Sequence, residues 1–216
     1  MKILILGATG RTGRLLVEEA VKQGYQINVL VRNENKLTVT SASITVFQGI
    51  PVNQQELVKA MQGCDAILST LNISRTSDFP WAALRTPKDF LSGSMKNIIE
   101  TADELKIKRI IITTAWGTNE TKKDIPWWFA WLIDHSNIGY AYRDHEVQED
   151  LLKASSLNYT IVRPSGLTNS LKNKTVMVSL NNVPAPGLTI SRKNVALFML
   201  DTLKNNLYQN QCPAIS

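Results

Sequence analysis

The sequence predicts an α/β fold in which a doubly wound parallel sheet carries helices on both faces. Two observations predict it. Short apolar runs alternate with segments whose apolar residues recur at helical spacing, and the first run, Lys2 to Leu6, ends in a glycine-rich turn. Such alternation is typical of parallel sheets with right-handed crossovers. Because ligands bind at the carboxyl ends of the strands in these folds, we expect the functional site there.

Length and composition favour a single domain. The chain has 216 residues, of which 44% are hydrophobic, and this is enough for one buried core. The net charge of +6 is spread along the chain, so we expect no nucleic-acid partner. No apolar run reaches the ~18 residues that span a bilayer, so we expect no membrane segment.

The cysteines predict neither a metal site nor an oxidising compartment. Cys64 and Cys212 lie far apart and lack metal-ligand spacing. The first predicted strand begins at Lys2, which leaves no secretory leader before it. We therefore expect a cytoplasmic monomer or homodimer without a bound metal.

The glycine-rich turn after the first strand is a candidate phosphate-binding loop. Gly7 permits the sharp turn, Gly10 leaves the backbone bare where a pyrophosphate would approach, and Gly13 lets the following helix pack close to the strand. The helix N-terminus then faces the anion. This G-x-x-G-x-x-G spacing is a weak signal alone, and its strand–loop–helix context carries the interpretation. The other candidate cofactor-binding residues of the loop are Thr9, Arg11 and Thr12.

The second apolar run, Ile27 to Val31, ends in Arg32. An NAD-binding site commonly places an acid there, on the ribose 2′-hydroxyl, whereas a basic residue suits the 2′-phosphate of NADP(H). Arg11 could reach the same phosphate, and guanidinium groups match phosphate oxygens well. The alternative is that both arginines are solvated surface residues beside an ordinary turn. We expect NADP(H) to be the cofactor.

The middle of the chain continues the alternation with a strand at Ile44 to Phe47, a short helix at Gln54 to Met61 and a strand at Asp65 to Leu71. The exit of this last strand should run past the cofactor, although it is equally compatible with an ordinary polar strand end. Residues 73–86 are expected to form a loop at the site. Thr86 is expected to cap a long helix with Pro87 at its first position. The candidate cofactor-binding residues here are Ser69, Thr70 and Leu71.

The fifth strand, Arg109 to Thr114, should deliver Thr113 and Thr114 to the nicotinamide end of the cofactor. The segment after it places three tryptophans between Trp127 and Trp131. They form either the wall of a pocket for a flat acceptor or a short helix packed on its own core or on another subunit. Three aromatic residues within five positions of a helix cannot all face one pocket, so at least one should point elsewhere.

The last third of the chain predicts a helix from about Tyr140 to Ala154 and a sixth strand from Tyr159 to Val162. Residues 165–190 are expected to cap the substrate side, with strand-like pieces at Thr175 to Leu180 and Leu188 to Ile190. Ser191 should cap a final helix. The sixth strand exits through further candidate cofactor-binding residues, Pro164, Ser165 and Gly166.

Four pieces of sequence resemble a known family: G-A-T-G-R-T-G, Val31-Arg32, Arg163-Pro164 and S-R-K-N-V-A-L-F-M-L. With them the chain resembles the atypical short-chain dehydrogenases/reductases of the NAD(P)H-binding, NmrA-like branch. Within that branch it is similar to the biliverdin-IXβ reductases/flavin reductases. The resemblance covers nearly the whole chain and implies a Rossmann-type fold that binds NAD(P).

The resemblance also locates departures from the family pattern. Ordinary members carry Tyr-x-x-x-Lys before the sixth strand, where the tyrosine gives a proton to a carbonyl and the lysine holds the nicotinamide ribose. Ala141 and His145 stand at these positions here, and the similar flavin reductases also carry a histidine there. The resemblance implies that His145 binds the nicotinamide ribose. Ala115, Gly166 and Ile50 replace a serine, a histidine and an aspartate of the family.

The leading hypothesis is an NADPH-dependent oxidoreductase that passes hydride to a flat conjugated acceptor such as a flavin or quinone. His145 and Thr114 are its candidate catalytic residues. Such acceptors collect their proton from water, so the missing Tyr/Lys pair is no objection. The acceptor pocket is expected to be largely apolar with few charged groups, bounded by some of Trp116, Trp127 and Trp128 and by residues after Pro164. The alternatives are an NADP(H)-sensing regulatory protein without catalysis and, more weakly, a sugar-nucleotide epimerase or dehydratase.

Overall fold

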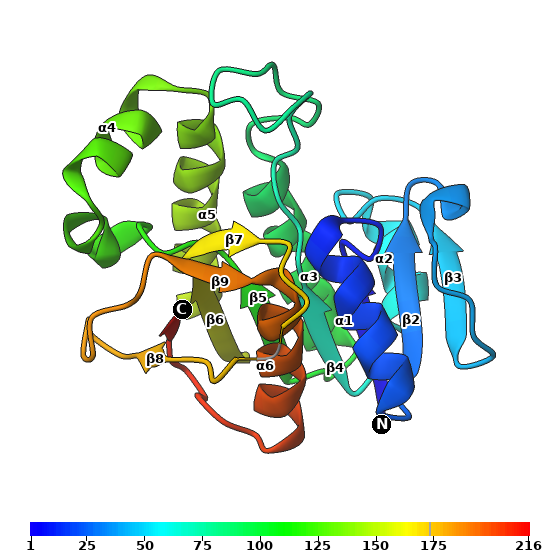
Figure 1. The fold of residues 1–216 in the computed structure, drawn as a ribbon. Helices are drawn as coiled ribbons and strands as arrows, with labels where there is room; N and C mark the ends of the chain where they lie inside the picture. The colour runs from blue at the N-terminus through cyan, green and yellow to red at the C-terminus, as the bar shows by residue number, and fades with distance from the viewer. Residues whose placement is uncertain (173) are drawn as a thin grey trace.

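A computed structural model describes residues 1–172 and 174–216. Its centre is one eight-stranded sheet with the order β3-β2-β1-β4-β5-β6-β10-β8 (Figure 1). The first six strands of this order run parallel to their neighbours. This order is the one found in dinucleotide-binding α/β folds, so the predicted doubly wound sheet is confirmed. The six strands are β1 (Lys2–Leu6), β2 (Gln26–Val31), β3 (Ile44–Gln48), β4 (Ala66–Ser69), β5 (Arg109–Thr113) and β6 (Asn158–Pro164).

Helices cover both faces of the sheet and enclose two apolar cores (Figure 1). One core lies under α1 (Arg11–Lys22) and α6 (Arg192–Lys204). The other lies under α2 (Gln54–Met61), α3 (Phe90–Glu104) and α5 (Ile138–Lys153). Because successive side chains of a strand point to opposite faces, β1 supplies both cores and is buried throughout its last four residues.

The long helix α3 begins later than its sequence predicts. It starts at Phe90 with Asp89 at the N-cap position, and Asp89 makes no side-chain cap. Asp144 of α5 instead accepts hydrogen bonds from the backbone N–H groups of Leu91 (2.6 Å) and Ser92 (3.2 Å). The Thr86 hydroxyl accepts the N–H of Ser74 and so closes the preceding loop. The predicted cap at Thr86 is therefore wrong, because a carboxylate from another helix satisfies these donors.

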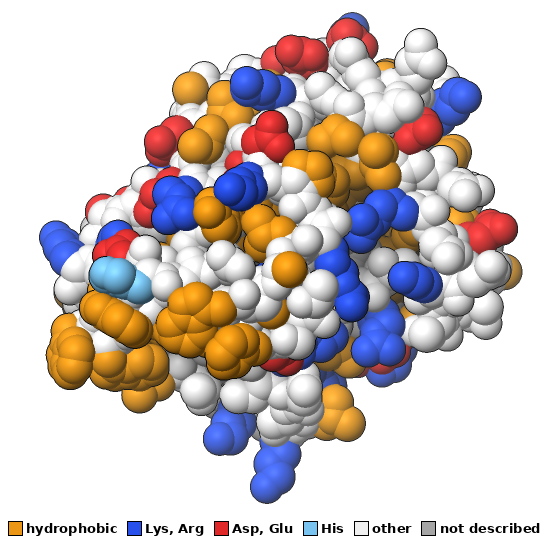
Figure 2. All heavy atoms as spheres, turned by 90° about the horizontal axis from the view of Figure 1, so that it is seen from above, with side chains coloured by type: hydrophobic (Ala, Val, Ile, Leu, Met, Phe, Trp, Pro, Cys, Tyr) orange, Lys and Arg blue, Asp and Glu red, His pale blue; other side chains and the backbone are white. Residues whose placement is uncertain are grey.

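Between β5 and α5 the chain forms η2 (Asn119–Asp124) and α4 (Trp127–His135), while η1 (Glu34–Lys36) follows β2. The inner side of α4 packs through Phe129, Ala130 and Ile133 into a separate small core that contains Trp116. The three tryptophans of α4 are each at least 52% exposed, and Figure 2 shows hydrophobic side chains gathered at the lower left of this view.

The C-terminal part is more regular than its sequence indicates. β7 (Gly166–Thr168) pairs with β9 (Thr189–Ser191) as a small separate parallel sheet. β8 (Val178–Ser179) is shorter than predicted and pairs with β10 (Ala214–Ile215), so it extends the main sheet. Residue 173, which falls within the segment 165–190 that was predicted to cover the substrate side, lies outside the described residues. The Ser191 hydroxyl accepts the N–H of Asn194, so the predicted cap of α6 is confirmed.

Candidate functional site

Two connected hollows lie where the parallel strands end. The first is a groove of about 380 Å³ that runs from the glycine-rich turn across the ends of β1, β4 and β5. The second is a cavity of about 730 Å³ between the end of β6, α4, α5 and the small β7–β9 sheet. Thr114, His145 and Pro164 are among the residues that line both hollows, so they lie where the hollows meet. The charged residues Arg11, Arg75, Asp78 and Arg192 also line both. Figure 2 looks onto this end of the molecule, where basic side chains gather near the middle.

The glycine-rich turn has the shape of a phosphate cradle. Gly7 has φ +82°, a conformation that favours glycine, and its carbonyl accepts the N–H of Gly10 at 2.9 Å. A Cβ at Gly13 would collide with the Gly7 carbonyl, so the helix can approach the turn only with glycine there. The N-cap residue Gly10 offers no side-chain cap. The free N–H groups of the first turn of α1 therefore fit an anion such as a pyrophosphate.

The two arginines predicted at the ribose phosphate behave differently. Arg32 is exposed and lines the groove beside Leu30 and Gly49. Arg11 instead makes a bidentate ion pair with Asp78 of the 73–86 loop, with N–O distances of 2.8 and 2.9 Å. Hydrogen bonding from Arg11 lowers the pKa of the Asp78 carboxyl. Among the described residues Arg32 has no ion-pair partner, so its guanidinium is available to a cofactor, whereas that of Arg11 is engaged.

The exits of β4 and β5 lie along the groove. Thr70, Leu71 and Thr113 line it, as do Thr9 and Thr12 of the glycine-rich turn. Ser69 does not line it, because this residue is buried and its Oγ accepts the N–H of Leu71. Ser69 therefore has no exposed surface in the groove with which to make its predicted contact with the cofactor.

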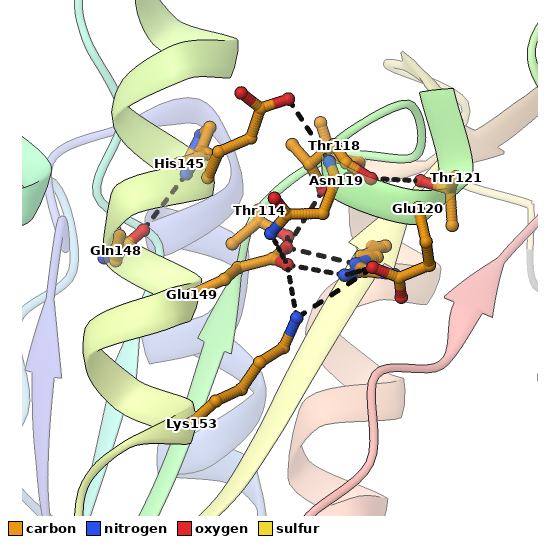
Figure 3. Close-up of polar contacts among 12 residues, drawn as sticks. Thr114, Thr118, Asn119, Glu120, Thr121, His145, Gln148, Glu149 and Lys153 are labelled. Carbon is orange, nitrogen blue, oxygen red and sulfur yellow. Dashed lines mark hydrogen bonds and ion pairs between the residues drawn. The ribbon is translucent and has the colours of Figure 1, made fainter. Parts of the chain in front are cut away.

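His145 lies at the meeting point of the two hollows and is buried on α5. Its Nδ1 is 3.1 Å from Oε1 of Gln148, as Figure 3 shows. Burial lowers the pKa of His145, and the Gln148 contact opposes this only in part. With the carboxamide oxygen as acceptor, Nδ1 carries the hydrogen of a neutral imidazole. Nε2 is then an acceptor suited to a ribose hydroxyl and is not a proton donor.

Thr114 is tied to a buried carboxylate. Its hydroxyl donates to Glu149 at 2.7 Å, and Thr118 donates to the same oxygen at 2.9 Å (Figure 3). The Arg163 guanidinium forms an ion pair with Glu149 and also with Glu120. Because the hydroxyl hydrogen of Thr114 points to Glu149, the structure leaves only its lone pairs for a ligand. Thr114 therefore lines the site without having a proton to donate.

The electrostatics of Glu149 explain why it stays charged. Burial alone would raise the pKa of its carboxyl, but hydrogen bonds and charge from Arg163, with hydrogen bonds from Thr114 and Asn119, lower it to about 2. The carboxylate thereby holds the ends of β5 and β6 to α5. Sequence reasoning missed this network and the Asp144 cap. The Arg163-Pro164 pair at the strand exit was the one available signal, because a buried arginine requires a partner.

Part of the predicted substrate site lines the second hollow, the larger cavity. Trp116 and Trp128 line it, together with Phe129 and Tyr142. Trp127 lines neither hollow and is 81% exposed, because it lies on the outer side of α4. Its predicted place at the acceptor pocket is therefore wrong. Ser165 and Gly166, predicted as cofactor-binding residues, line this cavity and not the groove.

The expectation of few charged groups on the cavity wall is also wrong. Arg11, Arg75, Asp78 and Arg192 line this cavity. The 73–86 loop brings in two of them, and the start of α6 brings in Arg192. No pattern in the loop sequence indicates this placement, since it depends on how the loop folds back over the sheet.

Among the described residues at this site, no tyrosine has a free hydroxyl to donate a proton to a carbonyl, since Tyr140 lines neither hollow. The Tyr142 hydroxyl donates to the backbone carbonyl of Trp116 at 3.4 Å, and burial raises its pKa. Lys88 and Arg143 lie against the ring of Tyr140. Across the described parts of the chain, no helix is long and apolar enough to cross a membrane, and no cluster of three His, Cys, Asp or Glu residues could hold a metal ion.

The sheet order, the glycine cradle and the groove beside it define a Rossmann-type protein that binds a nicotinamide cofactor. Residues 7–206 match the family model described as NAD(P)H-binding. The chain belongs to this NAD(P)H-binding family.

Curated relatives carry several kinds of name. The photosystem II assembly factor Ycf39 of Cyanophora paradoxa is 31% identical over 172 residues, which cover 79% of this chain and 47% of the relative. The chain thus spans about half the length of that protein. The sugar epimerase YhfK of Bacillus subtilis, itself described as uncharacterized, is 28% identical over 98% of this chain and 92% of its own length.

Solved structures share the fold over the whole chain. ChuY of Escherichia coli O157:H7, described as an anaerobillin reductase, has a TM-score of 0.82 at 20% identity and is covered to 96%. A short-chain dehydrogenase/reductase of Veillonella parvula in complex with NADP has a TM-score of 0.80 at 18% identity and is covered to 94%. At these identities the likeness establishes the fold.

Proposed function

We propose that this protein is an NADPH-dependent reductase that transfers hydride to a flat conjugated acceptor such as a flavin or a quinone. The observation that carries the proposal is the meeting of the cofactor groove and the larger cavity at Thr114, His145 and Pro164. A reduced nicotinamide supplies a hydride, and the cavity offers room for a second flat molecule beside it.

The cavity suits a planar ring system. Its volume of about 730 Å³ is in the range of small-molecule sites. Trp116, Trp128 and Phe129 supply aromatic faces and edges against which a conjugated ring can pack. The missing side chain at Gly166, which also lines this cavity, leaves further room.

The polar groups around the meeting point favour an acceptor that needs no acid from the protein. The hydroxyl hydrogens of Thr114 and Tyr142 are engaged by Glu149 and by the Trp116 carbonyl. Burial lowers the pKa of His145, which favours the neutral imidazole, and its Nδ1 lies 3.1 Å from Oε1 of Gln148. Hydride carries two electrons and one hydrogen to the acceptor, and a flavin or quinone then takes its proton from water. Catalysis would rest on the positioning of two flat rings.

NADPH is the proposed cofactor because of Arg32. This side chain is exposed at the groove and has no ion-pair partner among the described residues. The 2′-phosphate of NADPH would supply an ion-pair partner for Arg32 through charge-assisted hydrogen bonds. His145 would accept a hydrogen bond from the nicotinamide ribose, and the turn from Gly7 to Gly13 would bind the pyrophosphate.

The test is the oxidation of NADPH followed by absorbance, with a panel of flavins, quinones and biliverdin. Turnover above the uncatalysed rate is expected with at least one of them. Trp128→Ala should then lower kcat/KM for the acceptor, because Trp128 lines the cavity. Trp127→Ala is the matched control, because Trp127 is the neighbour of Trp128 in the sequence but its side chain is exposed outside the cavity. Equal effects of the two substitutions would contradict the proposed acceptor site.

A second candidate is a regulatory protein that binds NADP(H) and signals to a partner without catalysis. The observation that favours it is the aromatic surface over α4 and the 73–86 loop, formed by Trp127, Trp131, Phe79 and Trp81, each at least 46% exposed. Exposed aromatic surfaces of this kind commonly mark interaction sites. Tight NADPH binding with no turnover of any acceptor would select this function. The epimerase alternative is weaker, because Tyr142 is engaged and no lysine stands four residues after it.

A further inference from the structure

The wall of the acceptor cavity carries more positive charge than its acids balance. Arg11, Arg75 and Arg192 line it together with one carboxylate, Asp78, and the bidentate pair with Arg11 engages both oxygens of that carboxylate. Arg75 donates to the backbone carbonyls of Phe79 and Pro80 (both 3.1 Å). Arg192 donates to the carbonyl of Leu167 (3.3 Å) and to Oδ1 of Asn169 (2.7 Å). Among the described residues, neither Arg75 nor Arg192 has an ion-pair partner of its own.

This arrangement is costly as it stands. Arg192 is 8% exposed. Burial lowers the pKa of Arg192, and the positive charge of Arg11 lowers it further. Burial likewise lowers the pKa of Arg75, with the attraction of Asp78 and the repulsion of Arg11 as smaller effects. Partly buried cations without counterions are unfavourable, and a bound anion would relieve both.

The neutral partners of these arginines also hold them in place. Each guanidinium is fixed by oxygen acceptors of its own surroundings, which leaves other N–H groups to bind a ligand. Arginine binds carboxylates and phosphates through two parallel hydrogen bonds. The pair therefore matches an oxyanion group of either kind.

The anion could belong to the cofactor or to the acceptor. The pyrophosphate has donors of its own in the glycine-rich turn and at the start of α1. Arg192 lies at the start of α6, and it is anchored to Leu167 and Asn169 on the cap side of the cavity. Arg75, Arg192 and Leu167 line both the groove and the cavity, whereas Asn169 lines the cavity alone. Because the pyrophosphate already has donors of its own and Asn169 anchors Arg192 on the cavity side, an anionic group of the acceptor is the better match.

We propose that Arg75 and Arg192 form an anion subsite that binds a carboxylate or phosphate group of the acceptor, while its conjugated ring lies beside Trp116 and Trp128. The cavity then has an aromatic part for the ring and a basic part for the charged group. This inference rests on the proposed reductase function. It narrows the proposed acceptors to flat molecules that carry a carboxylate or a phosphate, because an uncharged acceptor would leave the basic part of the cavity empty.

Matched pairs of acceptors test the inference. FMN and riboflavin differ by a phosphate, and biliverdin and its dimethyl ester differ by two carboxylates. The unmodified protein should reduce the anionic member of at least one pair with the higher kcat/KM, and the pair that discriminates identifies the group. Arg75→Gln and Arg192→Gln should each lower kcat/KM for that anionic member by about ten- to a hundredfold, the loss of a charge-assisted hydrogen bond. The uncharged member should change little.

The controls separate the subsite from cofactor binding and from folding. Arg85→Gln alters an exposed arginine of the same loop that lines neither hollow, and it should leave all rates unchanged. Arg75→Lys should recover part of the discrimination. The dissociation constant of NADPH should stay within about twofold in both glutamine variants, which is far less than the loss of one charged hydrogen bond. If the buried Arg192 variant fails to fold, Arg75→Gln alone decides.

Several outcomes would overturn the inference. An equal loss of NADPH affinity would assign the arginines to the cofactor, and equal kinetics for both members of each pair would remove the subsite. If no acceptor is turned over, the reductase function fails separately, and binding of the same pairs to the NADP⁺ complex decides. Tighter binding of an anionic member that depends on Arg75 would then support the subsite. No saturable binding of any of the four would overturn it.

Discussion

At the scale of single residues, Arg32 carries the choice of cofactor. It is exposed at the groove and without an ion-pair partner among the described residues. Arg32→Ala should weaken NADPH binding by about ten- to a hundredfold, because one charge-assisted interaction with the 2′-phosphate is lost. NADH binding should be nearly unchanged. Calorimetric titration of both cofactors measures this.

The control for Arg32 is Arg14→Ala, which removes an exposed arginine of α1 that lines neither hollow. It should leave both cofactor affinities unchanged. Equal affinities of the unmodified protein for NADPH and NADH would contradict the prediction. So would a parallel loss of both affinities in Arg32→Ala.

His145 predicts a flat pH response. Burial lowers the pKa of its imidazole from an ordinary 6.5, so the folded protein keeps it neutral at and above that pH. NADPH affinity should therefore vary little between about pH 6.5 and pH 8. His145→Phe should weaken NADPH binding by about two- to tenfold through loss of one neutral hydrogen bond. Fluorescence titrations across the pH range measure both effects.

Two results would contradict the proposed role of the neutral His145 ring. A step in the dissociation constant near pH 6.5 that disappears in His145→Phe would mean that the imidazolium, and not the neutral ring, binds the cofactor. An unchanged affinity in His145→Phe at every pH would remove the residue from the site.

At the scale of elements, the six strands β1 to β6 were predictable and the contacts between helices were not. Apolar runs such as Ile27 to Val31 are buried on both faces of a parallel sheet, so hydrophobicity alone locates them. The cap of α3 comes from Asp144, 53 residues away from Leu91, and no local pattern indicates it. β10 has two residues and depends on pairing with β6 and β8, so its own sequence carries no strand signal.

The cap of α3 predicts an asymmetry between two aspartates. Asp144→Ala should destabilise the protein by about 1 to 2 kcal/mol, because two backbone donors at the helix start lose their acceptor. Asp89→Ala should cost much less, although Asp89 occupies the N-cap position, since its side chain makes no cap hydrogen bond. Urea denaturation of both variants measures this difference. Equal costs, or a larger cost at Asp89, would contradict the described cap.

At the scale of the whole molecule, one buried ion pair connects the elements that form the site. Glu149 and Arg163 connect α5 to β6, and the Thr114 and Thr118 hydroxyl groups attach the exit of β5 to the same carboxylate. The folded pKa of Glu149 is about 2, below its ordinary 4.5. Its contribution to stability is therefore complete above about pH 4.5 and is lost as the pH falls toward 2.

That pKa difference corresponds to roughly 3 kcal/mol. Glu149→Gln should therefore lower the free energy of unfolding at neutral pH, and its stability should depend less on pH in the acidic range than that of the unmodified protein. Denaturant titrations at a series of acidic pH values measure both. Parallel pH dependences of the two proteins would mean that Glu149 is not the group responsible.

The cofactor half of the site was more predictable than the acceptor half. The geometry at Gly7, Gly10 and Gly13 was predictable, because few residues other than glycine permit a tight turn and a close approach of the helix. The acceptor cavity depends on how the 73–86 loop and α4 fold over the sheet, which placed Arg75 on the wall and Trp127 outside it. The cytoplasmic location, the single domain and the oligomeric state stay predictions.

The central claim is that hydride passes from NADPH to an acceptor in this cavity, and isotopic substitution tests it most directly. NADPH carrying deuterium at either face of nicotinamide C4 is mixed with the protein and FMN without oxygen, and flavin reduction is followed in a single turnover. The account predicts slower reduction, with deuterium lost from the nicotinamide, for one face only. Reduction at the uncatalysed rate, with equal isotope effects for both faces despite tight NADPH binding, would contradict it.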